Sequence, residues 1–159
     1  MTGDGQYFRA GVGAVISDGK GRVLAFERVD TAGAWQLPQG GLEAEEEPLQ
    51  GVLREIREET GIPAAALALV TAYPEPLAYE LPPHVRSKKT GRGQVLYWFF
   101  FRLRDENVID LALSGEFRAW RWLALRNLAA TTVVFRRSLY RRLADYHAAS
   151  NPHDQGGGT

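Results

Sequence analysis

The 159-residue chain contains no cysteine at all. This absence excludes disulfide bonds, thiolate metal sites and thiol catalysis, and with them any disulfide-linked partner. Long apolar runs are also missing: no stretch approaches the roughly 18 apolar residues of a membrane-spanning helix. The N-terminus lacks the basic, apolar and small-residue layout of a secretory signal. We therefore expect a cytoplasmic protein with no membrane partner.

Net charge is absent too, because 19 basic and 19 acidic residues cancel. Bulk charge therefore gives no argument for non-specific binding to nucleic acid. The charges are segregated, however. Residues 43–59 hold seven glutamates and two arginines, whereas residues 117–142 hold seven arginines and no acid. Such blocks can be ordinary solvated faces, or the acidic block can hold cations while the basic block meets a polyanion.

The composition is that of a globular protein, with 45% hydrophobic and 24% charged residues. The length fits one domain over residues 1–159. Residues 1–6 and the glycine-rich tail 151–159 are expected to be flexible ends.

Apolar periodicity divides the chain into strands and helices. Strands are predicted where β-branched and aromatic residues cluster or alternate, over residues 9–17, 22–28, 67–73, 94–103 and 117–123. The first two should form a hairpin around the turn at residues 18–21. Helical spacing predicts helices over residues 48–60 and 132–147. This order of elements predicts an α/β sandwich with a mixed β-sheet.

The first predicted helix has clear boundaries. Pro48 suits a first helical turn, and Gly61 suits the position just past a helix end. The apolar face that should pack on the sheet is formed by Leu49, Val52, Leu53 and Ile56.

Three carboxylates share a narrow face of this helix, opposite the apolar residues. At about 100° per residue, Glu59 lies about 40° to one side of Glu55, and Glu58 about 60° to the other. Gly51 is on the same face and removes side-chain bulk there. Clustered carboxylates repel one another unless a cation neutralises them, and oxygen ligands favour Mg²⁺ or Mn²⁺. The pattern also fits a solvent-exposed helix with pairs such as Arg54–Glu58.

The spacing around these carboxylates favours the cation site. Residues 40–62, GGLEAEEEPLQGVLREIREETGI, resemble the Nudix box G-x5-E-x7-R-E-U-x-E-E-x-G-U at every defined position, where U is a bulky aliphatic residue. The resemblance implies an α/β/α sandwich and a Mg²⁺- or Mn²⁺-dependent hydrolase. Such an enzyme cleaves a phosphoanhydride bond by attack of water on phosphorus, with no covalent intermediate.

The resemblance also implies roles for individual residues. Glu46 should fold back to the helix, and Arg54 should brace a carboxylate. The implied metal ligands are Glu55, Glu58, Glu59 and Gly40. The implied catalytic residues are Glu58, Glu59 and Arg54, together with Glu116 from outside the box, and any of the three glutamates could be the general base.

Flanking segments resemble one subgroup, the bacterial RNA 5′-pyrophosphohydrolases and diadenosine polyphosphate hydrolases. The similar segments are YFRAGVG at residues 7–13, WQLPQGG at 35–41, GEFRAWRW at 115–122 and VVFRRSLYRR at 133–142. Carried over, these segments make Arg9 and Arg136 candidate phosphate contacts and Phe135 a candidate base-stacking ring. Arg28 ends the second predicted strand, close in sequence to the box, and could also reach a phosphate. Phe135 also fits a core position, and Arg28 also fits an ordinary solvated arginine.

Three further features are candidates for contact with the substrate. Trp35 could stack on a substrate base or pack beside the sheet. The basic loop at residues 86–92 could close over a phosphate chain or be an ordinary surface loop. Tyr73 and Tyr79, which flank a proline-rich stretch, could frame an adenine.

The best interpretation is a Mg-dependent pyrophosphohydrolase acting on RNA 5′-triphosphate ends. The alternative in the same class is a diadenosine tetraphosphate hydrolase that gives ATP and AMP, and hydrolysis of nucleoside triphosphates is a third. A catalytically silent nucleotide-binding sensor is the alternative from another class. The intact set of Glu55, Glu58 and Glu59 argues against a sensor, because a pure binder does not need it.

Overall fold

The computed structural model describes residues 7–88 and 90–150, so the predicted flexible ends lie outside the described residues. Its strands are β1 (Phe8–Ser17), β2 (Val23–Arg28), β3 (Trp35–Gln36), β4 (Gln39–Gly41), β5 (Leu67–Ala72), β6 (Leu77–Glu80), β7 (Gly93–Leu103) and β8 (Phe117–Leu123). The helices are α1 (Pro48–Thr60), α2 (Leu125–Thr131) and α3 (Val134–Ser150). Short 3-10 turns are η1 (Ala64–Ala66), η2 (Pro83–Val85) and η3 (Glu106–Val108).

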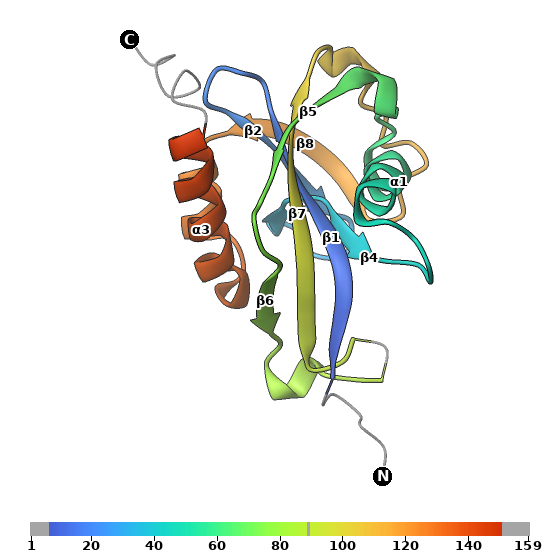
Figure 1. Ribbon diagram of the computed structural model, residues 1–159, viewed down its shortest axis with the longest axis vertical. Coiled ribbons are helices and arrows are strands. Elements are labelled where there is room, and N and C mark those ends of the chain that lie inside the picture. Colours follow the sequence, from blue (N-terminus) through green and yellow to red (C-terminus); the bar gives the residue numbers. More distant parts are fainter. Residues whose placement is uncertain (1–6, 89, 151–159) are drawn as a thin grey trace.

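All eight strands belong to one mixed sheet. Its main path runs β3-β2-β1-β7-β5, while β4 pairs with β1, β6 with β7 and β8 with β2. The long strands β1 and β7 are parallel and in register from Phe8 opposite Gly93 to Ser17 opposite Arg102. Figure 1 shows these two strands side by side through the middle of the molecule.

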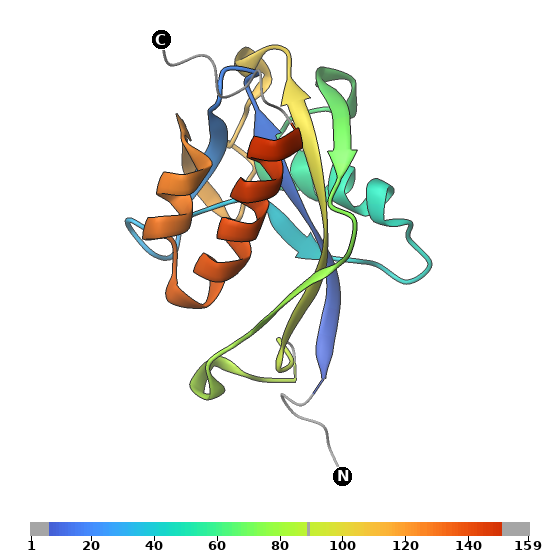
Figure 2. The ribbon, with the colours of Figure 1, turned by 60° about the vertical axis from the view of Figure 1, so that its left-hand side comes forward.

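The two faces of the sheet are covered by different helices, with α1 on one side and α3 on the other (Figures 1 and 2). Side chains alternate along β1, so Val12, Ala14 and Ile16 join the core under α1. Val15 faces the other way and joins the core under α2 and α3. The predicted α/β/α sandwich is therefore confirmed.

Most predicted elements are confirmed within two or three residues, but the hairpin is short. β1 and β2 pair antiparallel at Ser17 and Val23. Beyond the turn, β1 continues beside β4 and β7, whereas β2 pairs with β3 and β8. Four elements were not predicted, namely β3, β4, β6 and α2, because each is too short to show a periodic pattern.

Helix α1 has the predicted boundaries. Gly61 follows it with a φ of 77°, and its backbone N–H donates to the carbonyl of Arg57 at 2.9 Å. This left-handed conformation is the usual end of a helix at glycine. Val52 and Ile56 are buried in the core as predicted, but Leu49 is 37% exposed because it lies in the first turn, at the edge of the contact.

None of the helices within residues 7–88 and 90–150 has the length and apolarity that a membrane span requires.

Candidate active site

The three carboxylates of α1 differ in exposure. The side chain of Glu58 is 57% exposed and that of Glu55 only 14%. Glu59 is buried, with 5% of the residue exposed. The prediction that all three lie on a face opposite the apolar residues is therefore wrong for Glu59. At 40° from Glu55, it lies on the side of the helix that turns toward the sheet.

Arg54 holds the box together. Its guanidinium donates to both carboxylate oxygens of Glu46, at 2.7 and 2.9 Å. It also donates to Glu55 at 2.9 Å, to Glu58 at 3.3 Å and to the carbonyl of Gly41 at 2.9 Å. These charge-assisted bonds lower the pKa of Glu46 to about 2 and raise that of Arg54. The predicted bracing role of Arg54 fits this geometry.

The loop before α1 bends sharply enough to bring Glu46 to Arg54. Glu45 has a φ of 64° and is the sole non-glycine residue with positive φ in the described part of the chain. The left-handed region is unfavourable for a residue with a β-carbon, so the contacts on both sides must hold it there. Glu46 supplies them, since it also accepts from the backbone N–H of Glu43 at 3.0 Å.

Two glycines of the box touch its carboxylates. A β-carbon added to Gly40 would overlap the carboxylate of Glu55. One added to Gly51 would lie 2.6 Å from Leu42 and 3.0 Å from a carboxylate oxygen of Glu46. A β-carbon at either position would therefore displace one of these side chains, which is a reason for the presence of Gly51 inside a helix despite the cost of about 1 kcal/mol relative to alanine.

Glu59 is the most perturbed carboxyl of the site. Burial raises its pKa well above the usual value, and the neighbouring carboxyls of Glu55 and Glu116 raise it further, while the backbone N–H of Gln39 partly opposes them. One of its oxygens, Oε2, is buried without a hydrogen-bond partner. A buried, unpartnered oxygen among neighbouring carboxyls is costly unless a cation binds there.

These groups fit a divalent cation in their chemistry, because all are hard oxygen donors. Within residues 7–88 and 90–150, no three His, Cys, Asp or Glu side chains are already arranged around a metal-sized space. Arg54 holds Glu55 and Glu58 instead. Glu58 is exposed, so its side chain can turn from Arg54 toward a cation without disturbing the core.

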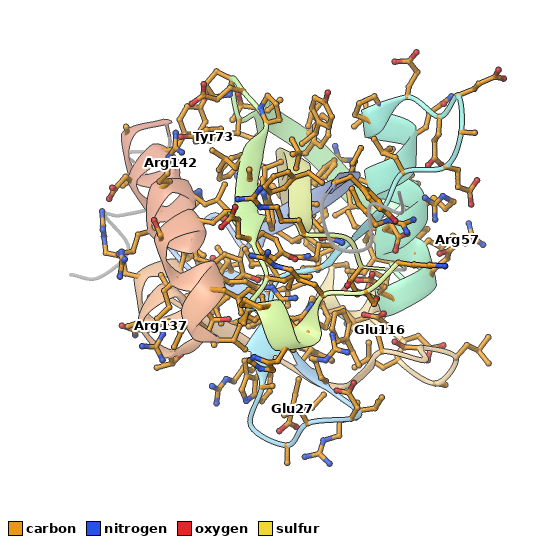
Figure 3. All side chains as sticks on the ribbon, turned by 90° about the horizontal axis from the view of Figure 1, so that it is seen from below. Glu27, Arg57, Tyr73, Glu116, Arg137 and Arg142 are labelled. Atoms are coloured by element: carbon orange, nitrogen blue, oxygen red, sulfur yellow. The ribbon has the colours of Figure 1, made fainter. Side chains whose placement is uncertain are left out.

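Glu116 reaches this site from another part of the chain. It directly precedes β8, and its carbonyl accepts from the backbone N–H of Val29 at 2.8 Å. Figure 3 shows Glu116 on the α1 side of the molecule. The pKa of Glu59 is raised mainly by burial and that of Arg28 mainly by its hydrogen bond to Asp30, and the charge of Glu116 contributes to both increases. The structure therefore brings the predicted residue outside the box together with the carboxylates of α1.

The predicted phosphate contacts Arg28 and Arg136 meet at one side chain. Gln36 Oε1 accepts from Arg28 at 3.3 Å and from Arg136 at 3.1 Å. The carboxylate of Asp30 forms an ion pair with Arg28 at 2.8 Å, and this contact lowers the pKa of Asp30 to about 2. Arg136 has no such ion pair among the described residues, so its positive charge is available to an anionic ligand, whereas that of Arg28 is already paired.

The predicted stacking ring also lies here. Phe135 stacks on Tyr79 with ring centroids 5.5 Å apart. The guanidinium carbon of Arg136 lies 5.2 Å from the centroid of Phe135 and 5.8 Å from that of Tyr79. A cavity of about 170 Å³ between β6 and α3 is lined in part by both rings. Phe135 is therefore at once part of the core boundary and part of a cavity wall.

A row of polar side chains connects this aromatic pair to β1. Arg9 lies opposite Gln94 on β7, and Gln94 lies opposite Tyr79 on β6, so the three share one face of the sheet. Gln39 Nε2 donates to the hydroxyl of Tyr79 at 3.0 Å and to Gln94 at 2.9 Å. Because the backbone of Gln39 also acts on Glu59, this residue links the aromatic pair with the carboxylates.

The sequence did not single out Gln36, Gln39 or Gln94. Gln36 and Gln39 belong to the WQLPQGG segment, but a glutamine carries no signal by itself because its partners lie far away in the chain. The distances in sequence are 100 residues for the bond from Arg136 to Gln36 and 55 for that from Gln39 to Gln94.

Several other candidates lie elsewhere or are already occupied. Trp35 packs beside the core, and the guanidinium of Arg121 covers its ring at 4.0 Å. Tyr73 contacts Tyr146 of α3 with ring centroids 4.9 Å apart, and it forms no contact with Tyr79 in the described structure. These positions favour packing roles for Trp35 and Tyr73.

Gly91, in the described part of the basic loop at residues 86–92, lies beside Arg9. A β-carbon on Gly91 would come within 3.3 Å of the Arg9 side chain. Arg86 donates to the carbonyl of Leu81 at 2.8 Å, and Arg92 pairs with Glu80 at 2.5 Å. Two of its basic side chains are therefore occupied by contacts within the chain.

Comparison with known proteins identifies the family of this chain. Residues 7–143 match the family model of the NUDIX domain. The RNA pyrophosphohydrolase of Zymomonas mobilis is 39% identical over 153 residues, covering 92% of this chain and 99% of the relative. That of Cereibacter sphaeroides is 37% identical, covering 92% of each chain. The solved E. coli dihydroneopterin triphosphate pyrophosphohydrolase is 25% identical with a TM-score of 0.70, covering 87% of this chain and 98% of that one. The chain belongs to the Nudix hydrolase family.

Proposed function

We propose that this protein is a Mg²⁺-dependent RNA 5′-pyrophosphohydrolase of the cytoplasm, where its RNA substrate is made. Water attacks a phosphorus of the 5′-triphosphate, the phosphoanhydride bond breaks, and RNA with a 5′-monophosphate and pyrophosphate are the products. The observation that carries the proposal is the buried, unpartnered oxygen of Glu59 among the carboxyls of Glu55 and Glu116. The names of the two bacterial relatives support RNA as the substrate.

The metal ligands would be Glu55, Glu58 and Glu59, with the backbone of Gly40 beside Glu55. A bound Mg²⁺ would polarise the phosphoanhydride oxygens and lower the pKa of the attacking water. Arg54 sets the positions of Glu55 and Glu58 through its hydrogen bonds. Glu58, Glu59 and Glu116 are the carboxylates that can accept the proton from water.

The substrate would lie between these carboxylates and the aromatic pair. Arg28 and Arg136, joined through Gln36, would bind the 5′ phosphates, and Arg9 would bind a further phosphate from β1. Phe135 would stack on a base, as aromatic rings do in recognition of single-stranded RNA. Gln36 and Gln39 would position these groups relative to the carboxylates.

The deciding experiment is product analysis on a substrate panel. With Mg²⁺, 5′-triphosphate RNA should be converted to 5′-monophosphate RNA with release of pyrophosphate. Diadenosine tetraphosphate should be cleaved more slowly, and chromatography of ATP and AMP measures that reaction. If only diadenosine tetraphosphate is cleaved, the protein is a diadenosine tetraphosphate hydrolase and the RNA assignment is wrong. Binding without turnover on any member of the panel would indicate the silent sensor.

A single-residue change tests the site itself. Glu58→Gln should lower turnover at least about a hundredfold, or about 3 kcal/mol of barrier, because it removes an anionic ligand and a candidate base. The fold should be unaffected, since Glu58 is exposed. Arg57→Gln is the matched control, because Arg57 is its exposed neighbour and points outward from α1 (Figure 3). Near-wild-type turnover of Glu58→Gln would contradict the assignment.

A further inference from the structure

A second cavity, of about 770 Å³, lies at the end of the sheet where β1 and β7 finish. Its walls come from the turn between β1 and β2, the last residues of β7, η3 and Trp122 of β8. The volume falls within the roughly 300–1,000 Å³ of small-molecule sites. None of its lining residues belongs to the candidate active site.

The cavity is distant from the arginine and aromatic groups described above. Arg9 lies near one end of β1, and Ser17, beside this cavity, lies at the other. Eight strand residues at about 3.3 Å each separate the two by roughly 26 Å. Figure 2 shows β1 and β7 running from the lower end of the molecule to the upper end.

Three cations line this cavity without an acidic partner. In the described part of the chain, the side chains of Lys20, Arg102 and Arg104 form no ion pair with a carboxylate. Most other arginines of the chain do pair, including Arg22 in the same cavity, which binds Asp18 at 2.7 Å. Unpaired cations gathered in a concave surface attract anions.

The guanidinium of Arg102 lies against the adjacent turn. Gly19 has a φ of 75°, and a β-carbon there would lie 2.6 Å from the guanidinium carbon of Arg102. The guanidinium therefore lies flat against a glycine that leaves room for it.

The acidic residues of the cavity have other partners. Asp18 accepts from the backbone N–H of Lys20 at 2.7 Å, in addition to pairing with Arg22. Asp105 accepts from the backbone N–H of Asn107 at 2.9 Å. Glu106 accepts from the indole N–H of Trp122 at 2.5 Å and so fixes the ring that forms one wall. These carboxylates support the local structure, and the three cations remain available.

From this arrangement we infer that the cavity binds a nucleotide, with its phosphate on Lys20, Arg102 and Arg104 and its base or sugar toward the Trp122 wall. The nucleotide can be free in solution or part of an RNA chain, since both present the same phosphate and ring chemistry. The inference goes beyond the proposed function, because binding here requires neither a 5′-triphosphate nor a divalent cation.

Binding of a short RNA with a 5′-hydroxyl end tests the site separately from hydrolysis, because that RNA carries no phosphoanhydride bond. Fluorescence anisotropy at several salt concentrations gives the slope of log K against log salt. Arg102→Gln combined with Arg104→Gln should weaken binding and reduce that slope by about 0.7 for each cation removed. The charge-matched control is Arg126→Gln combined with Arg141→Gln, on α2 and α3, which should leave the slope nearly unchanged.

A glycine pair tests the placement of Arg102 without changing charge. Gly19→Ala should weaken binding because the new methyl group displaces the guanidinium. Gly33→Ala is the matched control, because Gly33 has a similar φ of 81° but no atom lies within 4 Å of an added β-carbon. Melting curves of all variants confirm that each is folded.

The source of the nucleotide follows from a parallel titration with AMP. Loss of AMP binding in the Arg102 and Arg104 variant would support a free nucleotide as the ligand. Loss of RNA binding alone would support an RNA chain. Equal affinities and slopes in the cavity variant and its control, for both ligands, would overturn the inference. Hydrolysis of 5′-triphosphate RNA is measured in a separate assay. Failure of the proposed function can therefore be distinguished from failure of nucleotide binding in the cavity.

Discussion

Single glycines set the geometry of the carboxylates in this protein. Gly40 has no room for a β-carbon because the carboxylate of Glu55 occupies that space, whereas its neighbour Gly41 has nothing within 4 Å. Two adjacent glycines of the same motif therefore have different roles. Of these two positions, the box pattern specifies a glycine only at 40, where the contact with Glu55 lies.

The contrast between the two glycines gives a matched prediction. Gly40→Ala should displace Glu55, lower Mg²⁺ affinity and reduce turnover by at least about tenfold, with overpacking costing about 1–3 kcal/mol of stability. Gly41→Ala should leave Mg²⁺ affinity, turnover and stability nearly unchanged. Calorimetric titration with Mg²⁺, steady-state kinetics and thermal unfolding measure the three effects. Equal behaviour of the two variants would rule out the contact as the cause.

At the scale of elements, Tyr140 ties α3 to the segment before α1. It is fully buried, and its hydroxyl accepts from the backbone N–H of Leu37 at 3.0 Å. Leu37 directly follows Gln36 and lies two positions before Gln39, so this bond helps to position both glutamines of the site. Helix α3 thus contributes to the site through Phe135 and Arg136 and also through its core face.

Tyr140→Phe should lower the free energy of unfolding by about 1–3 kcal/mol, because it leaves the buried N–H of Leu37 without a partner. Denaturant unfolding at neutral pH measures this loss. Val134→Ala is a suitable control on the same helix, since Val134 is 74% exposed. An unchanged midpoint in Tyr140→Phe would show that water or another group satisfies the N–H.

The same residue predicts a dependence of stability on alkaline pH. Burial raises the pKa of Tyr140 from 10.0 to about 12. A raised pKa means that the folded state keeps a proton that the unfolded state releases, so this contribution is complete below pH 10 and is lost as pH rises toward 12. The stability difference between the wild type and Tyr140→Phe should therefore shrink over that interval, and unfolding at stepped pH values measures it.

For the whole molecule, cation binding should be linked to folding. Glu59 projects from α1 toward the sheet, and its pKa is raised by Glu55 and by Glu116 from before β8. A cation that relieves this repulsion binds the folded chain and not the unfolded one. At about 100 times the dissociation constant it adds about 2.7 kcal/mol of stability.

Mg²⁺ should accordingly raise the melting temperature by several degrees, and a chelator should reverse the increase. Glu58→Gln should show a smaller increase, while Arg57→Gln should match the wild type. Differential scanning fluorimetry with and without the metal measures these shifts. A melting temperature that does not respond to Mg²⁺ or Mn²⁺ would contradict a cation site in the folded chain.

The sequence by itself determined the elements with long periodic patterns and the local chemistry of α1. Pro48 and Gly61 bound the helix, and the carboxylates at 55, 58 and 59 follow from spacing around one axis. Arg9, Phe135 and Arg136 were identified as candidates through resemblance to a family, and Arg28 through its position close to the box. These inferences were possible because each depends on residues that are close in the chain or on a recognisable motif.

The tertiary structure alone decided which of these residues meet. It buried Glu59, placed Gln36 between Arg28 and Arg136, and directed Trp35 and Tyr73 to packing contacts. The second cavity also exists only in the folded chain, where the turn at Gly19 lies beside the end of β7. The physical reason is that packing of strands and helices brings distant residues together, and neither local spacing nor composition records those contacts.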